Sequence, residues 1–248
     1  MAKNILPIHK MLHVDYNRID NIALSNQVTL RRLVGILGMA LPLLLFFFLL
    51  IDMGYSSPLP SISHYYFTRV CSIFVATLSI LSVFLLIYKG EEPLDFYLSG
   101  TAGLFALCVV LFPTDNINGP YTVTILKISK FRMIFHYVSA AIFLSCLAAM
   151  SLFLFTKSDK PVKSLGSRKK MRNRLYRTCG SIMILAILLI LARGINIFGS
   201  AYNRFYDDHL LTFWMETLAV ESFGLSWLVK GETLFRDKTP GENKLTNN

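Results

Sequence analysis

Six long hydrophobic runs alternate with polar segments along this chain of 248 residues. Each run is close to the roughly 20 residues that a helix rising about 1.5 Å per residue needs to cross a hydrocarbon layer about 30 Å thick. The runs are apolar nearly all round, unlike the one-sided helices of soluble domains. The pattern predicts an all-α fold, a polytopic membrane helix bundle with about six transmembrane helices. The predicted spans are residues 33–51, 64–88, 96–112, 133–155, 179–199 and 211–229.

The polar segments divide the chain into an amino-terminal arm at 1–32, a six-helix membrane domain at 33–230 and a tail at 231–248. Lys and Arg gather in alternate segments, and nine of the 25 lie in 157–177. Such loops stay in the cytoplasm. We therefore expect this loop and both termini on the cytoplasmic side. The segments expected outside are 55–63, 114–132 and 202–210.

Composition agrees with this class of protein. The chain is 54% hydrophobic and 16% charged, and its net charge is +10. A soluble domain does not need so many apolar side chains for one core. The positive charge is explained by the cytoplasmic loops, with attraction to anionic lipid head groups as a second role. We therefore expect membrane lipids as partners and no nucleic acid.

Ionisable side chains inside predicted spans are costly and indicate a site. At about 1.5 Å per residue, Arg69, Arg193 and Glu216 all lie about 8 to 9 Å below the outer ends of their spans. Asn196 follows Arg193 at a helical i, i+3 spacing, which places both on one face. Together with Tyr65, these residues predict an outer-half polar pocket that binds a lipid head group or a small polar ligand.

One alternative is a metal site at the same level of the bundle. His64 and His136 begin their spans near the outer surface, and Asp115 lies just beyond the third span. Imidazole and carboxylate ligands suit zinc, and a catalytic zinc needs three protein ligands. These three residues predict a metal-dependent hydrolase acting on a lipid or an amide, with Ser61 or Ser63 as a weaker choice of nucleophile.

Other interpretations give the polar residues different roles. Arg193 and Glu216 come at nearly equal depth in consecutive antiparallel spans, which is the arrangement of a structural ion pair. Glu221, near mid-membrane, would instead serve a proton-coupled transporter. A structural membrane partner protein is the remaining class.

Three short motifs carry a resemblance to a known family. They are the run from Ser61 to Tyr66, the Tyr88-Lys89-Gly90 that ends the second span, and the Phe112-Pro113-Thr114 that closes the third. The chain resembles the bacterial proteins grouped as domain of unknown function 998, with weaker similarity at His136, Tyr137 and 213–216. The resemblance implies a six-helix protein of the bacterial inner membrane, and it implies no particular activity.

Overall fold

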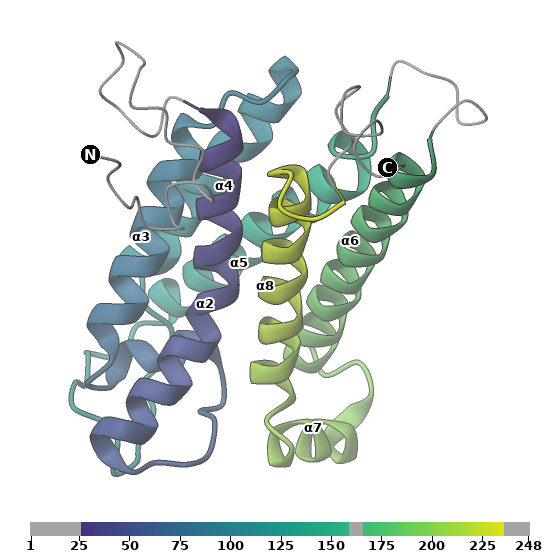
Figure 1. The fold of residues 1–248 in the computed structure, drawn as a ribbon. Coiled ribbons are helices and arrows are strands. Elements are labelled where there is room, and N and C mark those ends of the chain that lie inside the picture. Colours follow the sequence, from purple (N-terminus) through teal and green to yellow (C-terminus); the bar gives the residue numbers. More distant parts are fainter. Residues whose placement is uncertain (1–25, 159–165, 236–248) are drawn as a thin grey trace, which may run out of the picture.

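A computed structural model describes residues 26–158 and 166–235, and these residues form an all-helical fold without strands (Figure 1). Six long helices run through the molecule, and three shorter helical segments connect or extend them. The long helices are α2 (Gln27–Met53), α3 (Cys71–Ile87), α4 (Pro93–Leu111), α5 (Lys130–Ala149), α6 (Ser167–Gly194) and α8 (Leu211–Lys230). The short segments are the 3-10 helix η2 (Ile62–Phe67), the π-helical turn η3 (Met150–Leu154) and α7 (Gly199–Asp208).

Local signals place the ends of these helices. The side chain of Asn26 accepts a hydrogen bond from the backbone N–H of Val28 and so caps α2. Gly54 follows α2 with a φ of 64°, a left-handed conformation that glycine adopts without a steric penalty. Glu92 and Asp95 form a capping box around Pro93 at the start of α4. These helices therefore begin and end at short polar sequences, where the chain reverses direction.

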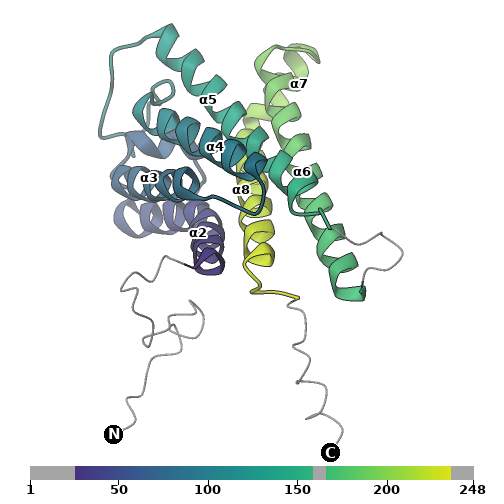
Figure 2. The same cartoon turned by 90° about the horizontal axis from the view of Figure 1, so that it is seen from above.

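Consecutive long helices run antiparallel and pack side by side. α3 lies between α2 and α4, α5 between α4 and α6, and α8 packs against both α6 and α2, which closes the arrangement (Figures 1 and 2). We call the end where α2 and α6 begin the basic end, and the end where α5 and α8 begin the far end. The short helix α7 lies crosswise beneath α8 and α6 at the far end (Figure 1).

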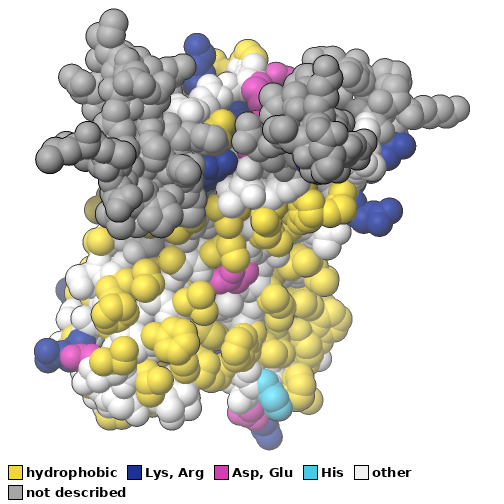
Figure 3. Space-filling model, viewed as in Figure 1, with side chains coloured by type: hydrophobic (Ala, Val, Ile, Leu, Met, Phe, Trp, Pro, Cys, Tyr) yellow, Lys and Arg dark blue, Asp and Glu magenta, His cyan; other side chains and the backbone are white. Residues whose placement is uncertain are grey.

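Helix length and composition support membrane insertion. In the described part of the chain, four helical segments are long and apolar enough to cross a membrane: Gln27–Met53, Pro93–Leu111, Lys130–Leu154 and Ser167–Gly194. The apolar helix α3 has 17 residues and is shorter than these. Hydrophobic side chains cover the middle of the molecular face, while Lys and Arg lie toward its ends (Figure 3). These features indicate a multi-pass membrane protein, and the full count of six crossings stays a prediction.

Small residues let neighbouring helices approach closely. A Cβ atom added to Gly35 of α2 would lie 2.8 Å from the carbonyl oxygen of Gly224 in α8, too short for a real contact. On the other side of the bundle, Ser82 of α3 donates a hydrogen bond of 2.7 Å to the carbonyl of Gly103 in α4. Close packing through Gly and Ser is a common basis of helix association in membranes.

Several predicted boundaries need correction. The predicted second span 64–88 is wrong in its first part, because residues 64–67 belong to η2 and helix α3 begins only at Cys71. Helix α6 begins at Ser167, inside the basic segment, and it ends at Gly194, before the end of the predicted fifth span 179–199. The expected loop 202–210 largely forms helix α7. Of the predicted arm and tail, 1–25 and 236–248 lie outside the described residues.

Candidate functional site

Two histidines, two serines and one aspartate meet at the far end of the bundle. We call them the Ser–His cluster: Ser61, Ser63, His64, Asp115 and His136. Three separate parts of the chain supply them, namely the start of η2, the segment after α4, and α5. Both histidines and the aspartate are predicted site residues, and the structure brings these three into one neighbourhood.

His136 is positioned through both of its ring nitrogens. Nδ1 lies 2.8 Å from the carbonyl oxygen of Phe112, and Nε2 lies 3.0 Å from Oγ of Ser63. A carbonyl oxygen only accepts hydrogen bonds, so Nδ1 carries the proton and Nε2 offers its lone pair. The hydroxyl of Ser63 therefore donates to His136. The ring is almost fully buried, with 2% of the residue exposed.

His64 belongs to a second serine–histidine pair. Its Nδ1 lies 3.1 Å from Oγ of Ser61, and the same oxygen accepts a hydrogen bond from the backbone N–H of His64, which caps η2. Its Nε2 faces a carboxylate oxygen of Asp115 at 3.9 Å and has no hydrogen-bond partner among the described residues. The space between these two atoms is too wide for a direct hydrogen bond.

Asp115 is the charged member of the cluster. Its carboxylate accepts hydrogen bonds from the hydroxyls of Tyr137, at 2.6 Å, and Thr114, at 2.8 Å. The neighbouring imidazole of His64, followed by these two hydroxyls, lowers the pKa of Asp115. Asp115 is therefore ionised at neutral pH, and about half of its side chain is exposed. It can accept a hydrogen bond from a bound molecule.

Glu216 fixes the turn that carries the serines. Its Oε2 atom accepts a hydrogen bond of 2.6 Å from the backbone N–H of Ile62. This contact joins α8 to the first residue of η2. Glu216 therefore holds the start of η2, which carries the serines of the Ser–His cluster, in place. The predicted ion pair of Glu216 with Arg193 does not form, because Arg193 binds Asp207.

Both arginines of the predicted pocket have other partners. Arg193 binds Asp207 through two hydrogen bonds, of 2.9 and 2.7 Å. Arg69 lies in the turn between η2 and α3, with 62% of its side chain exposed, and pairs with Asp52 at 2.9 Å. In the sequence both carboxylates fall outside the predicted spans, and hydrophobic spacing does not define the paths of the connecting segments that bring them to the arginines.

The last two predicted pocket residues also lie elsewhere. Helix α6 ends at Gly194, so Asn196 no longer continues the face of Arg193. Its φ is 56°, and its side-chain oxygen accepts a hydrogen bond from Asn203 in α7. Tyr65 is fully buried in the core near Phe213. The predicted set of Arg69, Arg193, Asn196, Glu216 and Tyr65 therefore does not form one pocket.

The three predicted zinc ligands do not form a metal site. Within 26–158 and 166–235, no group of three or more His, Cys, Asp or Glu side chains is placed to hold a metal ion. His136 directs one ring nitrogen to a backbone carbonyl and the other to Ser63. Three ligands converging on one ion are required for a catalytic zinc, so this prediction is corrected.

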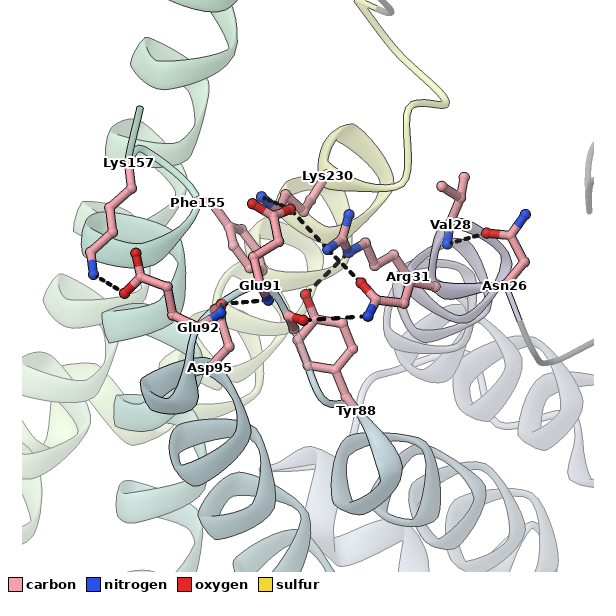
Figure 4. Close-up of polar contacts among 12 residues, drawn as sticks. Asn26, Val28, Arg31, Tyr88, Glu91, Glu92, Asp95, Phe155, Lys157 and Lys230 are labelled. Atoms are coloured by element: carbon pink, nitrogen blue, oxygen red, sulfur yellow. Dashed lines mark hydrogen bonds and ion pairs between the residues drawn. The ribbon is translucent and has the colours of Figure 1, made fainter. Parts of the chain in front are cut away.

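Sequence reasoning missed a polar network at the basic end (Figure 4). Arg31 is buried, and its guanidinium contacts Tyr88 at 3.1 Å and Glu91 at 3.1 Å. Lys230 at the end of α8 reaches the same oxygen of Glu91 at 2.9 Å. These hydrogen bonds and ion pairs connect α2, α8 and the turn before α4. The signal for this network in the sequence is the group of acidic residues in 91–95, which lies between helix ends that carry basic residues.

The fold and its apolar helices define a class, the multi-pass helical membrane proteins. Comparison of the chain with protein-family models, with curated proteins and with solved structures gives no match. The resemblance to the domain of unknown function 998 family therefore stays a prediction.

Proposed function

We propose that this multi-pass protein of the bacterial inner membrane binds a small polar ligand or a lipid head group through its Ser–His cluster. The orientation inferred from Lys and Arg places the far end outside. The observation that supports this proposal best is the pair formed by His64 and Asp115. A hydrogen-bond donor and an ionised acceptor face each other at 3.9 Å without bonding directly.

The chemistry of the cluster favours a ligand that carries hydroxyl groups. The Asp115 carboxylate near Nε2 of His64 favours the ring tautomer that carries its proton on Nε2, and in this tautomer Nδ1 accepts from the hydroxyl of Ser61. A ligand hydroxyl near Asp115 and His64 would donate to the carboxylate and accept from Nε2–H. Recognition of an anion by Arg69 and Arg193 is not favoured, because a carboxylate already neutralises each guanidinium. Glycerol-type or sugar head groups fit this arrangement.

Ligand-dependent thermal unfolding of the purified protein tests this proposal. The probes are glycerol, inositol, glycerol 1-phosphate and phosphocholine, added in series. We expect a hydroxyl-bearing probe to raise the melting temperature, and Asp115→Asn to weaken its binding by about fivefold or more, as for loss of a charged hydrogen bond. Asp208→Asn is the matched control, because Asp208 is exposed at the same end. The proposal would be refuted if Asp115→Asn and Asp208→Asn weakened probe binding equally, or if no probe changed the melting temperature.

A second candidate function is ester hydrolysis by Ser63 and His136. The observation that favours it is the hydrogen bond of 3.0 Å from the hydroxyl of Ser63 to Nε2 of His136, whose other nitrogen is held by Phe112. A base oriented by a third group is the usual arrangement of an activated serine. His136 would take the Ser63 proton as Oγ attacks an ester carbonyl and would return it to the leaving alcohol. Water would then release the acyl group from Ser63.

Labelling with a fluorophosphonate tests this second function. We expect the reagent to modify Ser63, with the modified residue identified by mass spectrometry of peptides. The reaction should be lost in Ser63→Ala and slowed about 100-fold or more in His136→Ala. His209→Ala is a control at the same end of the bundle. Unmodified Ser63 in folded protein would exclude a nucleophilic role while leaving the binding proposal intact.

A further inference from the structure

Three basic side chains of α6 lie on one face at the basic end. Lys170, Arg174 and Arg177 follow one another at i, i+4 and i+7, which brings them onto one side of the helix. All three are exposed, and none forms an ion pair within the described residues. Three other basic residues at this end form ion pairs. Arg31 and Lys230 pair with Glu91, and Lys157 pairs with Glu92.

These side chains border a groove of about 610 Å³ on the surface of α6. Its lining changes from charged to apolar along the helix, away from the basic end. The order is Lys170, Asn173, Arg174, Arg177, Thr178, Ser181, Ile182 and Leu185. From Arg174 to Leu185 the helix rises about 16 Å, at about 1.5 Å per residue. An amphiphile with an anionic head and an apolar chain has the same polarity along its length.

A second groove, of about 540 Å³, lies between α6, α8 and α2. It shares Arg174, Thr178 and Ile182 with the first groove, so the two grooves adjoin. Its lining is mostly apolar and includes Met39, Leu218 and Leu225, with one acidic side chain, Glu221. Among the residues that the structure describes, the first groove is lined by three positively charged side chains and by no acidic one, so an anionic group fits there.

We propose that an anionic glycerophospholipid binds at the basic end of α6. Its phosphate lies on Lys170, Arg174 and Arg177, one acyl chain follows Ile182 and Leu185, and the other lies in the groove between α6 and α8. Charge complementarity and the adjoining apolar grooves together favour a lipid over a soluble partner. Lys and Arg side chains are displayed beside apolar surface at the upper end of α6 (Figure 3). This site is separate from the Ser–His cluster at the far end.

Native mass spectrometry of the full chain, released from nanodiscs of equal parts phosphatidylglycerol and phosphatidylcholine, tests the proposal. We expect retained phosphatidylglycerol to exceed phosphatidylcholine. The triple variant Lys170→Gln, Arg174→Gln, Arg177→Gln should reduce that preference by about tenfold or more, because each basic residue near a membrane surface contributes attraction to anionic lipid. The charge-retaining triple Lys170→Arg, Arg174→Lys, Arg177→Lys should keep most of it.

A matched triple variant controls for net charge. It removes the same charge at exposed positions of the far end, through Lys127→Gln, Lys130→Gln and Arg204→Gln. This control should leave the preference for phosphatidylglycerol unchanged. Three results would overturn the proposal: equal retention of both lipids by the wild-type protein, equal loss in both neutralised triples, or full displacement of phosphatidylglycerol by inorganic phosphate. The last result would indicate a site for a free anion.

Discussion

Arg193 and Asp207 form a two-point ion pair, with Nε and Nη2 of the guanidinium at 2.9 and 2.7 Å from the two carboxylate oxygens. The pair joins the last turn of α6 to the last turn of α7 across the connecting residues 195–198. It therefore holds the short helix α7 against the end of α6. Glu216, at a similar predicted depth, binds the backbone of Ile62 instead.

A double-mutant cycle should detect coupling between Arg193 and Asp207. Both side chains are nearly half exposed, so we expect a coupling free energy of up to about 1 kcal/mol. The measurement is the free energy of unfolding of Arg193→Gln, Asp207→Asn and the double variant in detergent. The cycle of Arg193→Gln with Glu216→Gln is the control, and its effects should add within about 0.5 kcal/mol. The observed pairing of Arg193 with Asp207 would be contradicted if only the control cycle, of Arg193 with Glu216, showed coupling.

Replacing Glu216 tests how much its hydrogen bond with Ile62 contributes to the free energy of unfolding. Glu216→Leu leaves the backbone N–H of Ile62 without its acceptor, so we expect a loss of about 1 to 3 kcal/mol in the free energy of unfolding. Glu216→Gln retains an acceptor oxygen and should lose less. Equal stability of the two variants would show that the hydrogen bond contributes nothing.

A methyl group at the contact of α2 and α8 should destabilise the bundle. Gly35→Ala or Gly224→Ala forces a Cβ atom to within 3 Å of the opposite helix, and overpacking of this kind costs about 1 to 3 kcal/mol. Gly100→Ala is the control, because no atom lies within 4 Å of the added Cβ. That change should be neutral or raise stability by up to about 1 kcal/mol. Equilibrium unfolding in micelles measures all three.

The network at the basic end predicts a dependence of stability on pH. Hydrogen bonding to Lys230 and the nearby charge of Arg31 lower the pKa of Glu91 below its ordinary value of 4.5. The stabilisation is present above pH 4.5 and is lost as pH falls through the lowered pKa. The difference in melting temperature between wild type and Glu91→Gln should therefore be largest near neutral pH and shrink in acid. A constant difference down to pH 3 would contradict this.

Orientation is testable by single-cysteine labelling. With the four native cysteines replaced, a cysteine at Ser57 of the far end should react with an impermeant reagent in intact cells. One at Ser167, at the start of α6, should react only after the membrane is opened. The opposite pattern would invert the topology and place the Ser–His cluster in the cytoplasm.

The sequence by itself determined the class of fold. Hydrophobic runs of about 20 residues suffice to predict helices, because backbone hydrogen bonds in lipid must be satisfied within each segment. Small residues such as those from Ser99 to Gly103 permit close helix contacts in membranes, and Gly103 forms one with α3. The positions of His64, His136 and Asp115 beside the ends of hydrophobic runs also predicted that the three side chains lie at one level of the bundle.

Only the tertiary structure decided which polar groups meet. The helices are apolar nearly all round, so their sequences do not define how each helix is rotated about its axis. The partners of Arg69 and Arg193 depend on the paths of short connecting segments, and the role of Ser63 depends on where η2 lies against α5. Such contacts join residues far apart in the chain, and hydrophobic spacing within one segment carries no information about them.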